Sequence, residues 1–312
     1  MDRILVIRGG AIGDFILTLP ALKALRDANP EAHIEILGYK HIAALAENRF
    51  YANAVRSIEY GPLARFFARN ADLAPEMKDY FAKFNLVISY LYDPDEIFAG
   101  NLRRCGVAQL IQGTGKIDCS EHATRQLARP IEKLGLSVSD LAAKVFPSSQ
   151  DRQFAKEFLA GLSLPVVATH PGSGSAKKNW PLENWQELGN DLLSQIPLVV
   201  VSGEADEAQM AQLRAGWKMR DVRFAHNLGL PHLAAILEGS IFVGHDSGIS
   251  HLAAAAGAEC ILLFGLTDPA IWAPLNENAR VIRAPNNDLQ LLEVDAVRPA
   301  VDQALMRIGI KT

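Results

Sequence analysis

The sequence predicts an α/β protein made of two Rossmann-like, doubly wound domains. Strand-like apolar runs alternate with helix-like amphipathic runs along nearly all of the 312 residues, which is typical of βαβ units and a mostly parallel sheet. The alternation stops once, in the serine-containing stretch 137–151, and then restarts. We therefore place the domain boundary near residue 150 and expect the two domains to face each other across a cleft.

Residues 1–150 contain five expected strands, at 4–8, 33–38, 54–60, 86–91 and 110–112. Helices are expected at 20–28, 41–47, 62–69, 95–105 and 121–134. Pro20 suits the first position of a helix, where its missing N–H would have no partner, so we expect a separate short turn before it.

Residues 151–294 begin with an expected helix at 151–162. Strands are expected at 166–170, 198–203, 222–225, 241–244, 260–264 and 280–284, and helices at 182–193, 206–215, 231–239 and 249–256. A last helix, within about residues 295–312, is expected to pack back on the first domain.

Composition and charge exclude several classes of protein. Apolar residues make up 49% of the chain and charged residues 21%, and the formal net charge of -4 argues against a protein that coats nucleic acid. No apolar run approaches the roughly 20 residues of a membrane-spanning helix. The cysteines, Cys105, Cys119 and Cys260, show no metal-ligand spacing and indicate free thiols in a reducing compartment. We therefore expect a cytoplasmic protein.

The most informative segment is 242–257, where an apolar strand stops at polar residues and a helix-forming run follows. Asp246, Ser247, Gly248 and His251 would surround the start of that helix. Its outward N–H groups and its dipole favour an anion, so we interpret the segment as half of a nucleotide-sugar site. His251 is a candidate hydrogen-bond donor, and because the histidines lack metal-ligand spacing no metal site is expected.

Two further segments of the second domain fit the same site. The loop at 169–181 holds two glycines, Ser173 and Lys178, and predicts a phosphate cradle, with a solvated polar loop as the alternative. Glu204 and Glu207 follow the next strand, where a carboxylate can hold ribose hydroxyls. Helix-start acids that stabilise a dipole explain the two glutamates equally well.

The first strand-to-helix turn carries Gly10, Gly13 and Asp14. The two glycines supply the last two of the dinucleotide fingerprint, but Arg8 stands at its first position and the strand-end acid is missing. A nicotinamide-dependent oxidoreductase therefore remains only an alternative. Asp14 could accept a proton from a substrate hydroxyl, or it could be an acid that stabilises the first turn of a helix.

Together these motifs resemble the family-9 glycosyltransferases, whose best-known members are the ADP-heptose:lipopolysaccharide heptosyltransferases. The resemblance rests on Arg8-Gly-Gly-Ala-Ile-Gly-Asp14, on His170-Pro-Gly-Ser with Lys178-Asn-Trp-Pro181, and on Asp246-Ser-Gly-Ile-Ser-His251 with Phe264-Gly-Leu-Thr-Asp-Pro269. It implies a GT-B architecture and an inverting, metal-independent transfer in which the nucleotide sugar, expected to be ADP-linked, is a substrate and no cofactor takes part.

The resemblance also implies a role for individual residues. Asp14 corresponds to the catalytic base. The donor would be held in the second domain by Ser173, Lys178, Glu204 or Glu207, Asp246, Ser247, Gly248 and His251. The acceptor would be held in the first domain, where we expect contacts from Gly13, Arg65, Arg69, Arg103 and Arg125, with Arg65 and Arg69 one helical turn apart.

The sequence thus predicts a glycosyltransferase that moves a sugar, expected to be heptose, onto a lipopolysaccharide-core or related glycan. Its partners would be the nucleotide-sugar donor and a glycan or glycolipid acceptor, without nucleic acid. Peripheral contact with the cytoplasmic face of the inner membrane is consistent with such an acceptor. A non-catalytic nucleotide-sugar-binding protein, which would not need Asp14, is the second alternative.

Overall fold

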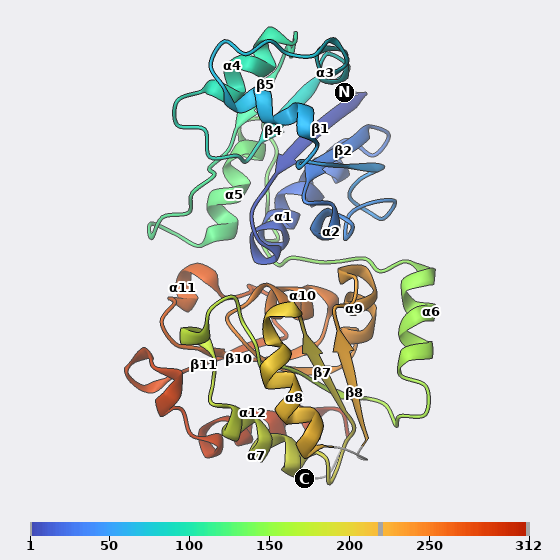
Figure 1. Ribbon diagram of the computed structural model, residues 1–312, viewed down its shortest axis with the longest axis vertical. Helices are drawn as coiled ribbons and strands as arrows, with labels where there is room; N and C mark the ends of the chain where they lie inside the picture. Colours follow the sequence, from blue (N-terminus) through green and yellow to red (C-terminus); the bar gives the residue numbers. More distant parts are fainter. Residues whose placement is uncertain (1, 218–220, 310–312) are drawn as a thin grey trace. The chain divides into compact units, whose positions relative to one another are not determined.

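The computed structural model describes residues 2–217 and 221–309 (Figure 1). The chain divides into two compact units, Met1–Leu141 and Ala142–Thr312. Each unit is a parallel sheet with helices on both faces.

The first unit contains a five-stranded parallel sheet in the order β3-β2-β1-β4-β5. Its strands are β1 (Arg3–Arg8), β2 (His33–Gly38), β3 (Ala54–Ser57), β4 (Leu86–Ser89) and β5 (Leu110–Gln112). The apolar side chains of β1 and β4 are fully buried, as expected where helices cover both faces.

Helices cover the first sheet on both sides. They are α1 (Ile12–Ala28), α2 (Lys40–Ala43), α3 (Pro75–Phe81), α4 (Ile97–Arg104), α5 (Ala123–Glu132) and the 3₁₀ helix η1 (Gly61–Phe67). Helices α1 and α5 pack against each other. On the other face, η1, α3 and α4 enclose a core that includes Phe66, Phe81 and Phe98.

Helix α1 differs from its prediction, because it begins at Ile12 and continues through Pro20. Phe15, Ile16 and Leu19, which precede the proline, are buried in the core together with Leu22, which follows it. Burial of this continuous apolar segment outweighs the helix bond that the proline cannot make. Asp14 therefore lies in the first turn of a long helix, not in a separate turn.

The second unit contains a six-stranded parallel sheet in the order β11-β10-β9-β6-β7-β8. Its strands are β6 (Val167–His170), β7 (Leu198–Ser202), β8 (Val222–His226), β9 (Ile241–His245), β10 (Glu259–Phe264) and β11 (Ala279–Arg283). All six strands were predicted, and each observed bound lies within a few residues of the expected one.

The helices of the second unit again form two layers. They are α6 (Ser149–Phe158), α7 (Leu182–Leu192), α8 (Glu207–Gly216), α9 (Leu230–Leu237), α10 (Gly248–Ala256), α11 (Pro269–Trp272) and α12 (Val294–Arg307), with short 3₁₀ helices η2 (Ala176–Lys178), η3 (Glu204–Asp206), η4 (Pro285–Asn287) and η5 (Leu289–Leu291). Helices α7, α8 and α12 share one core with the sheet. Helix α10 covers the other face, next to α9, and α6 packs on α9.

Helix α12 belongs to the second unit. Its buried side chains Val297, Val301 and Leu305 lie in the same core as the strands β9 and β10, and the helix packs beside α7 (Figure 1). Its packing within the second unit is thus established, and the expected contact of this helix with the first domain stays a prediction.

Both sheets have the Rossmann strand order, in which the direction of winding reverses once. The reversal lies between β1 and β4 in the first unit and between β6 and β9 in the second. Ligands of open α/β sheets bind outside the carboxyl ends of the strands at such a point. The loops after β1, β6 and β9 are therefore the places to look for a site.

Candidate functional site

The centre of the candidate site is a cluster on Asp246, directly after β9. Lys178 Nζ lies 2.7 Å from Asp246 Oδ2, and the hydroxyl of Thr267 donates to the same oxygen at 2.7 Å. The Asp246 side chain is only 11% exposed and that of Lys178 31%, so the pair is partly shielded from water. The structure thus brings together two predicted residues that are far apart in the sequence, and adds Thr267, for which the sequence analysis had no role.

The start of α10 lies next to this cluster in the chain. Ser247 is its N-cap, and its hydroxyl oxygen accepts the N–H of Ser250 at 3.3 Å. Gly248 is the first residue of the helix, and His251, one turn further, is buried. A helix N-terminus beside a lysine is suited to bind a negatively charged diphosphate.

The loop after β6 is tied together by its own side chains. Ser173 Oγ lies 2.8 Å from the carbonyl oxygen of Ser175 and 2.6 Å from Asn179 Oδ1. A hydroxyl has one proton to donate, so Ser173 bonds one of these acceptors at a time. The loop is therefore bonded internally through Ser173, while Lys177 is exposed, so the alternative of a polar loop with solvated lysines stays open.

Asp206, not Glu204 or Glu207, is the buried acid of the next loop. Glu204 and Glu207 are both exposed, and their ribose-binding role stays a prediction. Asp206 Oδ2 accepts the N–H of Gly203 at 2.8 Å and lies 3.7 Å from His170 Nε2. Burial opposes its ionisation, but the bonds from His170 and Gly203 outweigh this effect and hold the pKa of Asp206 below its usual value.

Gly172 is required by the packing between these loops. A Cβ atom at Gly172 would lie 1.9 Å from Asp206 Oδ1 and 2.4 Å from Asp206 Cγ, so no larger residue fits without moving the carboxylate. His170, at the end of β6, also lies 3.4 Å from the hydroxyl of Ser247 through its Nδ1. His170 and Asp206 thus connect the ends of β6, β7 and β9, a role that no sequence spacing indicated.

Asp14, in the first unit, has a structural role that the structure shows directly. Asp14 Oδ2 accepts the N–H of Ala11 at 2.9 Å, which satisfies a donor at the start of α1. The backbone of Gly10, at a φ of +90°, allows this approach, since a Cβ there would lie 2.7 Å from Asp14 Oδ2. The side chain is nevertheless 34% exposed, so the carboxylate can still meet a substrate.

The side chain of Arg8 supports the turn that carries Asp14 through hydrogen bonds to the first turns of α1. This side chain is 6% exposed. The guanidinium donates to the Thr18 hydroxyl at 3.0 Å and to the Asp14 carbonyl oxygen at 2.9 Å, and its Nη2 lies 3.6 Å from Asp14 Oδ1. Burial lowers the pKa of Arg8, and the Asp14 carboxylate opposes that shift. In the sequence, Arg8 shows only as a replacement for a glycine of the dinucleotide fingerprint, and nothing in its spacing indicates this supporting function.

The predicted acceptor residues do not form one group. Arg65 lies on η1, which ends at Phe67, so Arg69 lies beyond the helix and the two arginines are not one helical turn apart. Arg103 lies on α4 and pairs with Glu96 at 2.9 Å. Arg125 lies on α5, over the opposite face of the sheet, and Gly13 lies in the first turn of α1.

A small hollow marks the carboxyl ends of β4 and β5. Its volume is about 240 Å³, and residues 91–94 and 112–116 line it. Tyr92, in this lining, is 67% exposed. Leu91 lies 3.4 Å from the position of a Cβ at Gly9, so the hollow borders the turn that leads to Asp14.

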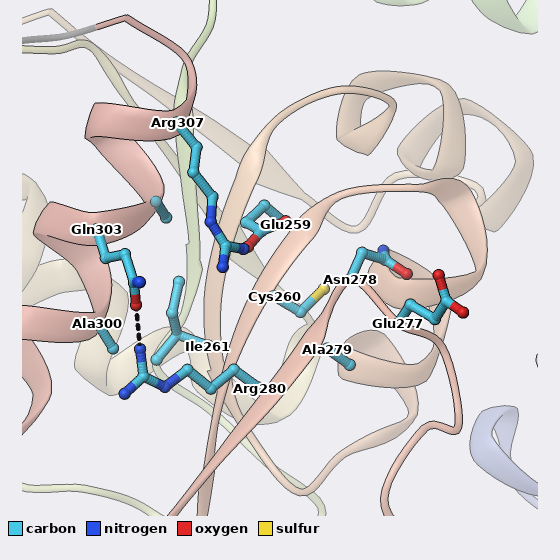
Figure 2. Close-up of a pocket in the computed structure, with 11 residues that line it drawn as sticks. Glu259, Cys260, Ile261, Glu277, Asn278, Ala279, Arg280, Ala300, Gln303 and Arg307 are labelled. Atoms are coloured by element: carbon cyan, nitrogen blue, oxygen red, sulfur yellow. Dashed lines mark hydrogen bonds and ion pairs between the residues drawn. The ribbon is translucent and has the colours of Figure 1, made fainter.

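A second hollow, of about 390 Å³, lies in the second unit, at the amino ends of two strands of its sheet. Figure 2 shows it between α12 and the strands β10 and β11, where Arg280 donates to Gln303 at 2.6 Å. Glu259 and Ala279, the first residues of these two strands, are part of its lining. The hollow is thus at the amino ends of the strands, away from the Asp246 cluster.

Two further observations concern the described part of the chain. No group of three or more His, Cys, Asp or Glu side chains within residues 2–217 and 221–309 could hold a metal ion. None of the helices described there combines the length and the apolar character that crossing a bilayer requires.

Sequence comparisons relate this chain to known proteins. A family model described as "Glycosyltransferase family 9 (heptosyltransferase)" matches residues 121–297. Lipopolysaccharide heptosyltransferase 1 of Escherichia coli O18:K1:H7 (strain RS218 / NMEC) is 34% identical over 128 residues. That match covers 40% of this chain and 39% of the relative, so it spans well under half of the relative's length.

Solved structures show the same fold. The E. coli ADP-heptose lps heptosyltransferase II is similar with a TM-score of 0.81 at 16% identity, over 99% of each chain. The E. coli heptosyltransferase WaaC with ADP is similar with a TM-score of 0.72 at 21% identity, over 96% of this chain and 99% of that one. These likenesses confirm the predicted fold class, two Rossmann-like domains of the GT-B type.

Proposed function

Because the chain belongs to glycosyltransferase family 9, we propose that it is an inverting glycosyltransferase that moves heptose from ADP-heptose to a glycan hydroxyl. The acceptor we propose is the lipopolysaccharide core or a related glycan. The names of its relatives support both substrates, since one is a lipopolysaccharide heptosyltransferase and another was solved with ADP.

The observation that carries the proposal is the Asp246 cluster at the winding reversal of the second sheet. Lys178 and the N–H groups at the start of α10 supply positive charge for a diphosphate, and Asp246 and Thr267 supply polar groups for the sugar. Ser173, Ser247, Gly248 and His251 belong to the same proposed donor site. One of Glu204 and Glu207 would hold the ribose.

The proposed reaction is a direct displacement at the anomeric carbon. The acceptor oxygen forms a bond to that carbon while the bond to the diphosphate oxygen breaks, and Asp14 accepts the proton of the acceptor hydroxyl. Negative charge then develops on the leaving ADP, where Lys178 and the fixed N–H groups stabilise the transition state more than the ground state. These residues supply the neutralisation without a metal, and the nucleotide sugar is a substrate, so the proposal includes no cofactor.

We assign the acceptor to the first unit. The hollow lined by residues 91–94 and 112–116 borders the Asp14 turn and offers the exposed ring of Tyr92 and the amine of Lys116. Gly13, next to Asp14, remains a proposed backbone contact. Arg65, Arg69, Arg103 and Arg125 do not form one group, and they remain proposed contacts for separate negatively charged groups of a large glycan. A glycolipid acceptor would bring the enzyme to the cytoplasmic face of the inner membrane.

One observation favours a second candidate function. The bond from Ala11 N–H to Asp14 accounts for this acid without any catalysis. A non-catalytic protein that binds a nucleotide sugar would therefore keep the donor site and show no transfer. The nicotinamide alternative is less favoured, because the buried Arg8 occupies the position of the first glycine of a dinucleotide fingerprint.

The experiment that tests the proposal compares nucleotides and then measures transfer. ADP should raise the melting temperature more than UDP or GDP at equal concentration, because a ligand that binds only the native state stabilises it. ADP-heptose supplied with a lipopolysaccharide that lacks heptose should then give ADP and an extended glycan. Binding of ADP without transfer would favour the non-catalytic candidate, and no preference for ADP would contradict the proposed donor.

A further inference from the structure

The buried side chain of His245 lies between two parts of the proposed donor site, the loop that carries Lys178 and the turn that carries Asp246. His245 is the last residue of β9, its side chain is fully buried, and it directly precedes Asp246. It takes no part in the chemistry proposed above. Its two ring nitrogens, however, both face the loop that carries Ser173 and Lys178.

The contacts of His245 pin both ends of that loop. The N–H of Trp180, where the loop ends, donates to His245 Nε2 at 2.8 Å. The carbonyl oxygen of Gly172, where the loop begins, lies 3.3 Å from His245 Nδ1. The ring also contacts Trp185 of α7 edge-on, with 5.3 Å between ring centroids.

These two contacts require one protonation state. Nε2 must be unprotonated to accept from Trp180, so the ring proton is on Nδ1, from which it can donate to Gly172. In a protonated imidazolium, the N–H at Nε2 of His245 would face the backbone N–H of Trp180, and this hydrogen bond would be lost. Burial favours the same neutral state and lowers the pKa of His245 to about 3.

We propose that His245 is a positioning residue of the donor site, which holds the 172–180 loop on the end of β9 so that Lys178 reaches the Asp246 carboxylate and the donor diphosphate. The inference rests on the proposed function. Lys178 is only two residues before Trp180, and Asp246 directly follows His245, so the imidazole fixes the spacing of the ion-paired residues.

Three substitutions separate the two contacts. His245→Gln keeps an acceptor for the Trp180 N–H, His245→Asn keeps a donor for the Gly172 carbonyl, and His245→Leu removes both. The control is His232→Asn, at a partly exposed histidine of α9 in the same unit. We expect ADP affinity, measured by calorimetry, to fall about 5- to 50-fold in His245→Leu, less in His245→Gln and His245→Asn, and not in the control.

A second readout does not depend on any ligand. Amide hydrogen exchange in residues 172–180 should become faster in His245→Leu, while exchange in β7 stays as in the wild type. If His245 served only to pack the core, His245→Leu would lower stability throughout the unit. The ratio of the amide exchange rates of residues 172–180 and of β7 would then stay unchanged.

The two readouts distinguish the inference from the proposed function. If the wild type does not bind ADP, the proposed function fails, and the exchange experiment still decides whether His245 holds the loop. If His245→Leu binds ADP as the wild type does, or if its loop exchanges no faster than that of the wild type relative to β7, the positioning role is wrong.

Discussion

Lys178 and Asp246, 68 positions apart in the sequence, form an ion pair of 2.7 Å between the 3₁₀ helix η2 and the carboxyl end of β9. The pair joins the loop after β6 to the turn after β9, and the Thr267 hydroxyl fixes the shared carboxylate oxygen. A diphosphate bound here would meet a lysine that is already oriented, which lowers the entropy cost of binding.

Removal of the lysine should affect donor binding as well as turnover. Lys178→Ala is expected to weaken ADP binding about 10- to 100-fold, because a charge-assisted hydrogen bond is lost. Lys177→Ala is the matched control, since Lys177 is exposed in the same 3₁₀ turn. Calorimetric titration with ADP measures both variants, and equal affinities for them would count against the proposed cradle.

Substitutions of Asp14 should separate its two roles. Asp14→Asn keeps an oxygen that can accept the Ala11 N–H, whereas Asp14→Ala loses that bond and about 0.5–2 kcal/mol of stability. Both should lower kcat roughly 10²- to 10⁴-fold, as expected for loss of a general base, with ADP affinity nearly unchanged.

Kinetics together with thermal unfolding check this prediction about Asp14. Asp27→Asn, at an exposed acid near the end of α1, is the control and should retain normal turnover. Near-normal turnover in Asp14→Asn would remove the carboxylate from the chemistry and leave only its structural role.

Gly172 and Gly174, two glycines of the loop after β6, should differ in their tolerance of a methyl group. Gly172→Ala is expected to destabilise the protein by about 1–3 kcal/mol, because its Cβ would overlap the buried Asp206 carboxylate. Gly174→Ala, which has nothing within 4 Å of the Cβ position, should leave stability nearly unchanged. Urea unfolding monitored by tryptophan fluorescence compares the two, and equal midpoints would refute the observed packing.

His245 should make stability depend on pH in a defined window. Burial lowers its pKa to about 3 in the folded protein, whereas an unfolded histidine has a pKa of about 6.5. Between these values the unfolded chain binds one more proton, so the contribution of His245 is complete above pH ~6.5 and is lost as the pH falls toward 3. The titratable groups around it are His170, Asp206 and Asp246.

The size of that effect follows from linkage. Between pH 5.5 and 4, the wild type should lose about 1.4 kcal/mol of unfolding free energy per pH unit more than His245→Gln, which has no proton to bind there. Denaturant unfolding at several pH values measures both slopes. Parallel slopes would show that His245 is not held neutral in the folded protein.

Much of the fold could be predicted from the sequence because parallel strands in such sheets are continuous apolar runs. The expected strands at 33–38 and 110–112 match the observed bounds of β2 and β5. Local sequence patterns gave the wrong helix boundary where tertiary packing determines it. In α1, burial of apolar side chains before and after Pro20 keeps the chain helical through the proline. Helix α3 was missed because Pro75–Phe81 is too short to show a period.

The candidate site was only partly predictable, because contacts between residues that are distant in the sequence leave no local pattern. Asp246 and Lys178 were found because each follows a strand in a polar segment, and strand ends in parallel sheets meet at one edge. Thr267, Asp206 and His245 act through contacts that no spacing along the chain displays. The acceptor arginines were chosen by charge alone, and charge does not indicate which face of a sheet a helix covers.

The most direct test of the central claim is a transfer assay with ADP-heptose and heptose-deficient lipopolysaccharide, followed by mass spectrometry of the glycan. The wild type is expected to add one heptose unit and release one ADP per unit added. Asp14→Asn should bind ADP as tightly as the wild type and form product about 10²- to 10⁴-fold more slowly. Heptose transfer by Asp14→Asn at the wild-type rate, or tight ADP binding by the wild type with no transfer at all, would contradict the account.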